Sequence, residues 1–293
     1  MKHLLTLSAD RPLDAGAEFR IGVRSVPYLA DHGFQDMVVL PGSFYIEMAL
    51  SVERELTKRV PGLVRNIAFH NPIILSPEDT VTKIEVRDRG DGRIEFTFYE
   101  ADVVDGSTRL SASRPFAAKL EIDRNQSTLR KSEPGEFSIE AFQAQAHAVI
   151  DSVQFYEKLR ENGNQYGPRF QNVSSIWRAS DQSLGRLSVA PEHRQGGPHY
   201  LHPSLLDSMT QVLAPFTMEE GKTFVLRSIE KLQLSDVNFP DTLWVHATRL
   251  PEDDGDAKRI VGNVRVFDQS GKPYLELSGV VLTLLDRVDV ADE

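Results

Sequence analysis

Apolar residues recur at every second position over much of this chain of 293 residues, and this period is typical of half-buried β-strands. The stretches 94–99 and 243–248 show the alternation most clearly. Turns rich in Gly and Asp, such as 88–92 and 268–271, separate neighbouring strands and favour a largely antiparallel sheet. Further strands are expected near residues 67–75, 81–88, 108–120, 172–190, 223–235, 258–267 and 273–285.

Two longer segments follow helical spacing instead. The segment from Gly42 to about Arg59 is apolar on nearly all sides, which predicts a buried helix. The segment from Pro203 to about Phe216 has one apolar stripe and a proline in its first turn. Shorter helices are expected at 137–148 and 152–161. The fold class predicted from these elements is α+β.

The order of the elements repeats along the chain at a constant offset. Pro41 and Pro203 each precede a long helix, and the strand 79–87 matches the strand 241–249 at the same offset. Such local features also occur in proteins without repeats, but two matches at one offset favour an internal duplication. Each half would be a helix wrapped by an antiparallel sheet, which buries its edge best against its twin. The predicted boundaries are 1–125 for the N-terminal half, 126–150 for a polar linker and 151–293 for the C-terminal half.

Composition narrows the classes of function. The chain has 43 acidic and 33 basic residues and no cysteine, so disulfides, thiolate nucleophiles and cysteine-bearing metal sites are excluded. A net charge of −10 with scattered Lys and Arg disfavours binding to nucleic acid or to anionic membranes. No apolar run suits a signal peptide or a membrane span, and we therefore expect a cytoplasmic protein.

Two segments carry candidate chemistry. His32 lies in a loop, and Pro41-Gly42 leads into the buried helix, whose free amides can bind a carbonyl oxygen that gains negative charge. His32 is then a candidate base. Asp207 and Gln211 are four residues apart and share the helix face opposite the apolar stripe. Taken alone, a turn histidine and a solvated helix face explain these residues better than catalysis does.

Other groups of residues give weaker signals. His193, His199 and His202 lie close together in a Gly/Pro-rich loop, but they lack a nearby pair of carboxylates, so no metal site is predicted. The sequence contains no phosphate-binding loop, dinucleotide fingerprint or nucleophile elbow. No dissociable cofactor is expected.

The two candidate segments, in this order and separation, resemble the dehydratase domains of modular polyketide synthases. The signatures of that family are HxxxGxxxxP, matched here from His32 to Pro41, and DxxxQ or DxxxH, matched from Asp207 to Gln211. The stretch 155–171 resembles the family's YGPxFQ region, and the likeness runs from about residue 20 to about residue 285. The resemblance implies a double-hotdog fold, in which two helix-in-sheet halves pack as a pseudodimer.

The resemblance also implies a reaction. Members of this family remove water from a 3-hydroxyacyl chain that is held as a thioester on the phosphopantetheine arm of an acyl carrier protein. Carried over, His32 removes the proton alpha to the thioester carbonyl and Asp207 protonates the leaving hydroxyl. Pro41-Gly42 would bind the carbonyl, Gln211 would orient Asp207 or the leaving hydroxyl, and Tyr166 would line the pocket. Implied partners are the carrier protein, other synthase domains and, as is common in the family, a second copy of the chain.

Three departures from the family pattern leave alternatives open. Asp36 replaces the motif glycine, Asn164 replaces a tyrosine and Leu226 replaces a proline. Asp tolerates a left-handed turn, but a carboxylate at position 36, which we also place at the substrate site, could disturb His32 or block substrate. The alternatives are a double-bond isomerase, a pyran- or furan-forming cyclase, and a silent binding module. Chain length, branching and stereochemistry depend on pocket shape, which the sequence does not give.

Overall fold

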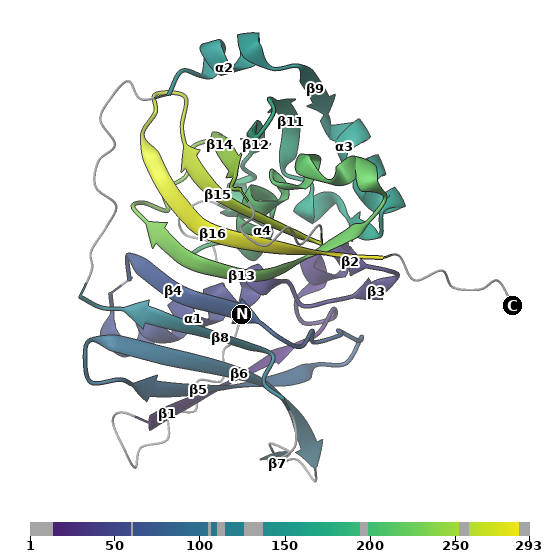
Figure 1. Ribbon diagram of the computed structural model, residues 1–293. Coiled ribbons are helices and arrows are strands. Elements are labelled where there is room, and N and C mark those ends of the chain that lie inside the picture. The colour runs from purple at the N-terminus through teal and green to yellow at the C-terminus, as the bar shows by residue number, and fades with distance from the viewer. Residues whose placement is uncertain are drawn as a thin grey trace, which may run out of the picture.

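The computed structural model describes residues 14–59, 61–104, 107–109, 115–125, 137–193, 199–251 and 258–286. Most of them build one long antiparallel sheet (Figure 1). Its first strands are β1 (Asp14–Ile21), β4 (Leu63–Phe69), β5 (Thr80–Asp88), β6 (Arg93–Val104), β7 (Ser107–Arg109) and β8 (Ala118–Asp123). The later strands are β9 (Ala148–Asp151), β11 (Val173–Arg178), β12 (Gln182–Ser188), β13 (Thr223–Leu234), β14 (Thr242–Arg249), β15 (Arg259–Phe267) and β16 (Pro273–Leu285). A small second sheet contains β2 (His32–Phe34), β3 (Met37–Val38) and β10 (Asn164–Tyr166).

The strand order of the long sheet is symmetric about its middle. It runs β1-β5-β6-β8-β4-β13-β16-β15-β14-β12-β11-β9, and β7 pairs with β6 off this path. Strands β4 and β13 meet at the centre, where Ile67 lies opposite Ile229, its equivalent at the offset that separates Pro41 from Pro203. From this pair outwards, β8, β6 and β5 are repeated as β16, β15 and β14. The predicted duplication is therefore present, with a pseudo-twofold axis at the two isoleucines.

Each half of the sheet packs on one central helix (Figure 1). These helices are α1 (Gly42–Thr57) and α4 (Pro203–Gln211), and they contact each other. Residues 43–53 of α1 and all nine residues of α4 are buried, because helix and sheet cover them on every side. The predicted α+β fold of two helix-in-sheet halves is thus confirmed, while the boundaries at 125 and 150 stay a prediction.

Two further helices belong to the C-terminal half. They are α2 (Ile139–Gln145) and α3 (Ser152–Glu161), the latter with the predicted bounds. Ile139 of α2 packs in a small cluster with Leu184, Trp244 and Phe267. Strand β9 follows α2 and pairs with β11. The segment predicted as a polar linker is therefore folded from residue 137 onwards, and 126–136 lies outside the described residues.

Several predicted elements have different ends in the structure. The expected strand 172–190 is a hairpin of β11 and β12. The expected strand 67–75 is β4, which ends at Phe69, before a proline that cannot donate to the ladder. The helix expected to reach Phe216 ends at Gln211 and is followed by a 3-10 turn that contains Pro215. Of the expected strand 108–120, the final residues belong to β8, and 110–114 lies outside the described residues.

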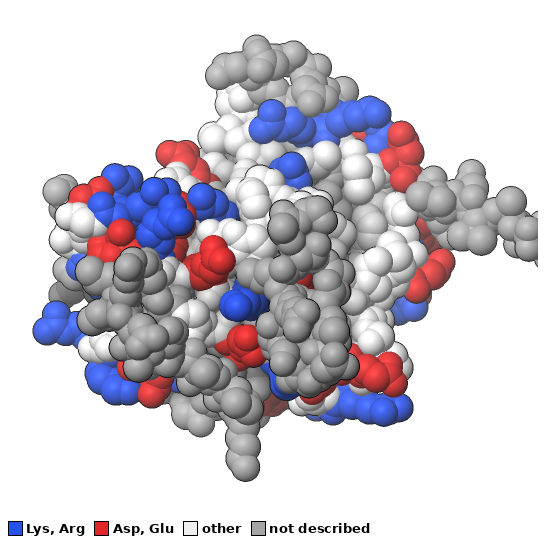
Figure 2. All heavy atoms as spheres, turned by 90° about the horizontal axis from the view of Figure 1, so that it is seen from below, with Lys and Arg blue, Asp and Glu red and all other residues white. Residues whose placement is uncertain are grey.

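Basic and acidic side chains lie side by side on the face of the N-terminal half shown in Figure 2. Arg93 pairs with Asp91 and Glu121, and Lys119 pairs with Glu95. Where both partners are exposed, as in Arg93–Asp91, an ion pair contributes little to stability. The helices of the described residues include none whose length and apolar character would let it span a membrane.

Candidate active site

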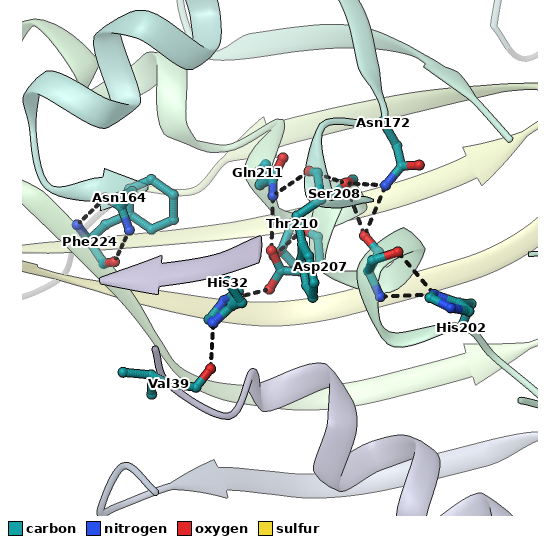
Figure 3. Close-up of polar contacts among 12 residues, drawn as sticks. His32, Val39, Asn164, Asn172, His202, Asp207, Ser208, Thr210, Gln211 and Phe224 are labelled. Atoms are coloured by element: carbon teal, nitrogen blue, oxygen red, sulfur yellow. Dashed lines mark hydrogen bonds and ion pairs between the residues drawn. The ribbon is translucent and has the colours of Figure 1, made fainter. Parts of the chain in front are cut away.

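His32 and Asp207, which belong to different halves of the chain, meet where the two halves join (Figure 3). The Nε2 atom of His32 is 3.8 Å from Oδ1 of Asp207. His32 begins β2, directly after the 3-10 turn Pro27–Asp31, and Asp207 lies in the second turn of α4. The structure therefore brings together the two residues predicted as base and acid.

One backbone contact decides which nitrogen of His32 can act as a base. Its Nδ1 lies 2.8 Å from the carbonyl oxygen of Val39, which can only accept a hydrogen bond. Nδ1 must therefore carry the proton, and in the neutral ring the lone pair is then on Nε2, which faces Asp207. The ring also packs against Tyr166 and Phe170, at 5.6 and 5.1 Å between ring centroids.

Asp207 is buried and held by its neighbour on α4. Gln211 donates from Nε2 to Oδ2 of Asp207 at 2.9 Å. The amide oxygen of Gln211 accepts from the Tyr156 hydroxyl at 3.0 Å, which fixes the orientation of the amide. Burial raises the pKa of Asp207, while the charge of His32 and the hydrogen bond from Gln211 act in the opposite direction. The raised pKa favours the protonated carboxyl that a general acid needs.

His32 and Asp207 both line a cavity of about 410 Å³. Most of the wall is apolar, and its polar members include Asn164, Tyr166 and Thr210. Burial, and then the charge of Asp207, raise the pKa of Tyr166, so its hydroxyl stays protonated. The apolar part of the wall comprises Phe34, Met37, Val39, Leu40, Phe69, Ile74, Phe224, Leu226 and Leu285, among others. Such a wall suits an apolar chain bound beside the two titratable groups.

The N-terminus of α1 reaches the same cavity. Gly42 is the first residue of this helix and lines the cavity, and Pro41 is its N-cap. A Cβ atom on Gly42 would lie 2.9 Å from Cζ of Phe69, so only glycine lets the helix terminus pack this closely. The amides of a helix N-terminus carry partial positive charge and favour a negatively charged oxygen. Gln211 and Pro41, both predicted as substrate-binding, are not among the described residues that line the cavity; Gln211 bonds to Asp207, which does, and Pro41 is the residue before Gly42.

Asp36 lies in the tight turn between β2 and β3. Gln35 and Asp36 have φ angles of 44° and 64°, the left-handed pair that a two-residue type I′ turn requires. The carboxylate of Asp36 accepts from Nε2 of Gln165 at 2.5 Å, and its backbone amide donates to Oε1 of the same side chain at 2.7 Å. The side chain is exposed and does not belong to the cavity wall formed by the described residues.

The other two departures from the family pattern are in the cavity wall. The side chain of Asn164 donates to the carbonyl of Phe224 at 2.9 Å and accepts from its amide at 3.1 Å (Figure 3). This reciprocal pair satisfies the buried amide and ties β10 to β13. Leu226, on β13, lines the cavity in the position where we expected the family's proline.

The three histidines of the Gly/Pro-rich loop are buried together near the start of α4. The rings of His193 and His202 are 4.1 Å apart, and those of His199 and His202 are 4.8 Å apart. Burial lowers the pKa of His202 to about 2 and that of His193 to about 4. In the part of the chain that the structure describes, no three His, Asp or Glu side chains are grouped to hold a metal ion.

Two protein-family models match the chain. One, described as the polyketide synthase dehydratase N-terminal domain, matches residues 134–292. The other, described as the polyketide synthase dehydratase domain, matches residues 7–101. The first of these models alone covers more than half of the chain.

Sequence relatives include large synthases. Polyketide synthase GfsE of Streptomyces halstedii is 27% identical over 279 residues, which are 93% of this chain and 7% of GfsE. Polyketide synthase PksN of Bacillus subtilis (strain 168) is 25% identical over 282 residues, which are 93% of this chain and 5% of PksN. The chain thus spans a small part of the length of these relatives.

Solved structures show the same fold. The dehydratase domain from the CurF module of the curacin polyketide synthase matches with a TM-score of 0.80 at 20% identity, over 94% of this chain and 96% of that one. The dehydratase domain of a mycocerosic acid synthase-like polyketide synthase matches with a TM-score of 0.79 at 18% identity, over 97% and 95%. The predicted double-hotdog fold is confirmed.

The fold and the site together define a class: double-hotdog proteins with a His/Asp pair where their halves meet. Within that class, the match over 134–292 shows that this chain belongs to the dehydratase domains of polyketide synthases.

Proposed function

We propose that this domain removes water from a 3-hydroxyacyl thioester to give the α,β-unsaturated thioester. The observation that carries the proposal is the pairing of His32 Nε2 with Asp207 Oδ1 at 3.8 Å in the wall of an apolar cavity. The two groups have complementary proton states, because the Val39 carbonyl leaves Nε2 free to accept and burial favours the protonated Asp207. A base and an acid side by side suit an elimination.

In the proposed reaction, His32 Nε2 takes the proton alpha to the thioester carbonyl. Negative charge develops on the carbonyl oxygen, and the amides at the N-terminus of α1, beginning with Gly42, stabilise it. The bond between carbon 3 and its oxygen then breaks, and the proton of Asp207 joins the leaving hydroxyl to form water. The proton on His32 restores Asp207 for the next cycle. Tyr166 lines the cavity and offers a further hydrogen bond.

Relatives support these roles. Two solved structures of the CurK dehydratase are described as inactive mutants, one with phenylalanine for a histidine and the other with asparagine for an aspartate. We propose the corresponding roles for His32 and Asp207. The substrate would arrive on the phosphopantetheine arm of an acyl carrier protein, and no dissociable cofactor takes part. Other synthase domains, and a second copy of the domain, are proposed as its neighbours.

The test is mass spectrometry of 3-hydroxyacyl chains, varied in length and branching, on a carrier protein or on pantetheine. The expected result is the loss of the mass of one water molecule. A folded domain that leaves every mass unchanged would contradict the dehydratase proposal. Nuclear magnetic resonance of the acyl chains whose mass is unchanged would then distinguish an isomerase or a cyclase from a silent module. An isomerase or a cyclase rearranges the chain without changing its mass, and a silent module leaves it as it was.

Removing the hydrogen bond from Gln211 is expected to move the alkaline limb of the pH profile to higher pH. In Gln211→Met the Asp207 carboxylate loses a donor that stabilises its charged form, so the pKa of Asp207 rises further. The alkaline limb of kcat/KM reports the acid, which must be protonated to act. The control is Gln182→Met, which removes a similar amide from His246 on the outer side of the sheet. A limb that stays in place or moves to lower pH would contradict the assignment of Asp207 as the acid.

Replacing Asp36 with glycine is expected to leave the rate of water loss within about twofold of the wild type. Glycine relieves the steric strain of a side chain at a positive φ angle but loses the hydrogen bond from Gln165. The two effects on stability are about 1 kcal/mol each and have opposite signs. Single-turnover rates and thermal unfolding measure the outcome, and Asp36→Asn, which can still accept from Gln165, is the matched control. A large change in rate for Asp36→Gly would show that the carboxylate acts on the site.

A further inference from the structure

Glu47 is a buried carboxylate on α1 that bonds to the other half of the molecule. Its Oε1 accepts from the amide of Tyr200 and its Oε2 from the amide of Leu201, each at 2.8 Å. Ser51, one turn later on α1, also donates to Oε1 at 3.0 Å. Tyr200 and Leu201 lie directly before His202, the N-cap of α4. Glu47 therefore fixes the segment that leads into the helix carrying Asp207.

The same carboxylate is connected to the segment that carries His32. His199 Nδ1 lies 3.7 Å from Oε1 of Glu47, and His199 Nε2 lies 3.1 Å from the hydroxyl of Tyr28. Tyr28 belongs to the 3-10 turn Pro27–Asp31, which ends immediately before His32. Burial, and then the charge of Glu47, raise the pKa of Tyr28, so its hydroxyl stays protonated and keeps its hydrogen bond with His199 in either tautomer of the ring. A line of polar contacts thus runs from Glu47 through His199 to Tyr28.

Aromatic rings also join the segment before α4 to the turn before His32. The ring of Tyr28 lies 4.8 Å from that of His202 and 6.2 Å from that of Phe170. Phe170 in turn packs on the ring of His32 at 5.1 Å. Tyr28 thus contacts the segment that leads into α4 with its ring, through His202, and with its hydroxyl, through His199. Through Phe170 it is also packed against His32.

We propose that Tyr28 and His199, anchored on Glu47, are positioning residues that set the separation of His32 from Asp207. The inference rests on the proposed function, since it assigns these residues to the same acid–base pair. None of the three is among the described residues that line the cavity. The pair comes from opposite halves of the chain; Glu47 contacts the approach to Asp207 directly and the approach to His32 through His199 and Tyr28. Burying a carboxylate costs stability, and at Glu47 this cost is offset by hydrogen bonds, two of which come from backbone amides of the other half.

The test compares Tyr28→Phe, which keeps the ring but loses the hydroxyl, with His199→Gln and the double variant. Ser51→Ala is the matched control, because it removes a hydrogen bond to Glu47 from within α1 and leaves the line to Tyr28 intact. We expect kcat to fall about 10- to 100-fold in Tyr28→Phe and in His199→Gln, the two link variants, while KM stays within about twofold of wild type. A small misplacement of the reacting groups has this effect. The double variant is expected to lose no more than the stronger single variant. Wild-type kcat in Tyr28→Phe would overturn the proposal.

A second measurement does not depend on turnover. Side-chain nitrogen resonances of His32, assigned by their loss in His32→Phe, report the position of the ring in the full domain. We expect these resonances to move in Tyr28→Phe and His199→Gln and to stay in Ser51→Ala. If wild-type protein loses no water but the resonances move, the dehydratase proposal fails and the positioning role stands. Unchanged His32 resonances in both link variants overturn the positioning role, whatever the activity.

Discussion

His32→Phe is expected to lower the rate of water loss by about 10²- to 10⁴-fold, the usual contribution of a positioned general base. Phenylalanine keeps a flat ring against Tyr166 and Phe170 but has no lone pair to accept the alpha proton. The cavity and the helix N-terminus at Gly42 remain, so substrate binding is expected to survive. The measurement is a single-turnover time course of the acyl thioester by mass spectrometry, with binding of a non-hydrolysable substrate analogue measured in parallel.

A second histidine provides the control for this experiment. His246 lies on β14, where it bonds to Gln182 and stacks on Phe137, away from the cavity. Burial lowers its pKa to about 4, so at neutral pH it is already an uncharged ring like phenylalanine. His246→Phe is expected to keep the wild-type rate. Equal losses in the two variants would mean that the effect of His32→Phe comes from folding and not from removal of a base.

The residues to which we assign the chemistry were easier to predict than those that hold them. His32 and Asp207 were found because a few spaced residues in each half match a known pattern. Tyr156 was missed, although its hydroxyl fixes the amide of Gln211 at 3.0 Å. That contact joins side chains 55 residues apart on different helices, and local periodicity carries no information about such pairs.

Periodicity was misleading for one face of α4. Asp207 and Gln211 lie opposite the apolar stripe, where an amphipathic helix normally meets water. Both are buried. Gln211 bonds to Tyr156 of α3 and to the carbonyl of Phe170, so α3 and the turn Pro168–Phe170 meet this face of the helix. A single helix pattern cannot show that elements outside the helix will pack against its polar side.

The β2–β3 hairpin was missed for a different reason. Two-residue hairpins of this kind are usually recognised by Asn-Gly or Asp-Gly, since both central residues need positive φ. Here Gln35 and Asp36 adopt those angles, at 44° and 64°, without any glycine. The turn is held instead by the two hydrogen bonds between Asp36 and Gln165 of β10. This tertiary contact replaces the local preference that the sequence lacks.

Asp207→Asn is expected to slow the elimination of water strongly and at the same time to stabilise the fold at neutral pH. Asparagine has the same shape and can still accept from Gln211, but it has no proton to give to the leaving hydroxyl. The expected loss in rate is again about 10²- to 10⁴-fold. The gain in stability follows from burial, which raises the pKa of Asp207 above its value in the unfolded chain.

The sign of the stability effect depends on pH. Below the unfolded-state pKa, Asp207 is protonated in both states, and its contribution to stability is fully present. As pH rises through the raised folded-state pKa this contribution is lost, because the unfolded chain releases the proton more readily. Asparagine stays neutral throughout, so the stability difference between variant and wild type is expected to grow as pH rises from the unfolded-state pKa to the folded-state pKa of Asp207. Above both values it is constant, at about 1.4 kcal/mol for each pKa unit that separates the two states.

Urea unfolding of both proteins across a pH series would measure this difference. A variant whose stability relative to wild type falls as pH rises would show that His32 and Gln211 outweigh the burial of the carboxyl, and that Asp207 is held as an anion. An anion could not protonate the hydroxyl without first taking up a proton, so the same curve bears on the mechanism. If the variant instead gains stability as pH rises, the cost of burying Asp207 is the stability that the fold gives up to keep an acid protonated at the proposed active site.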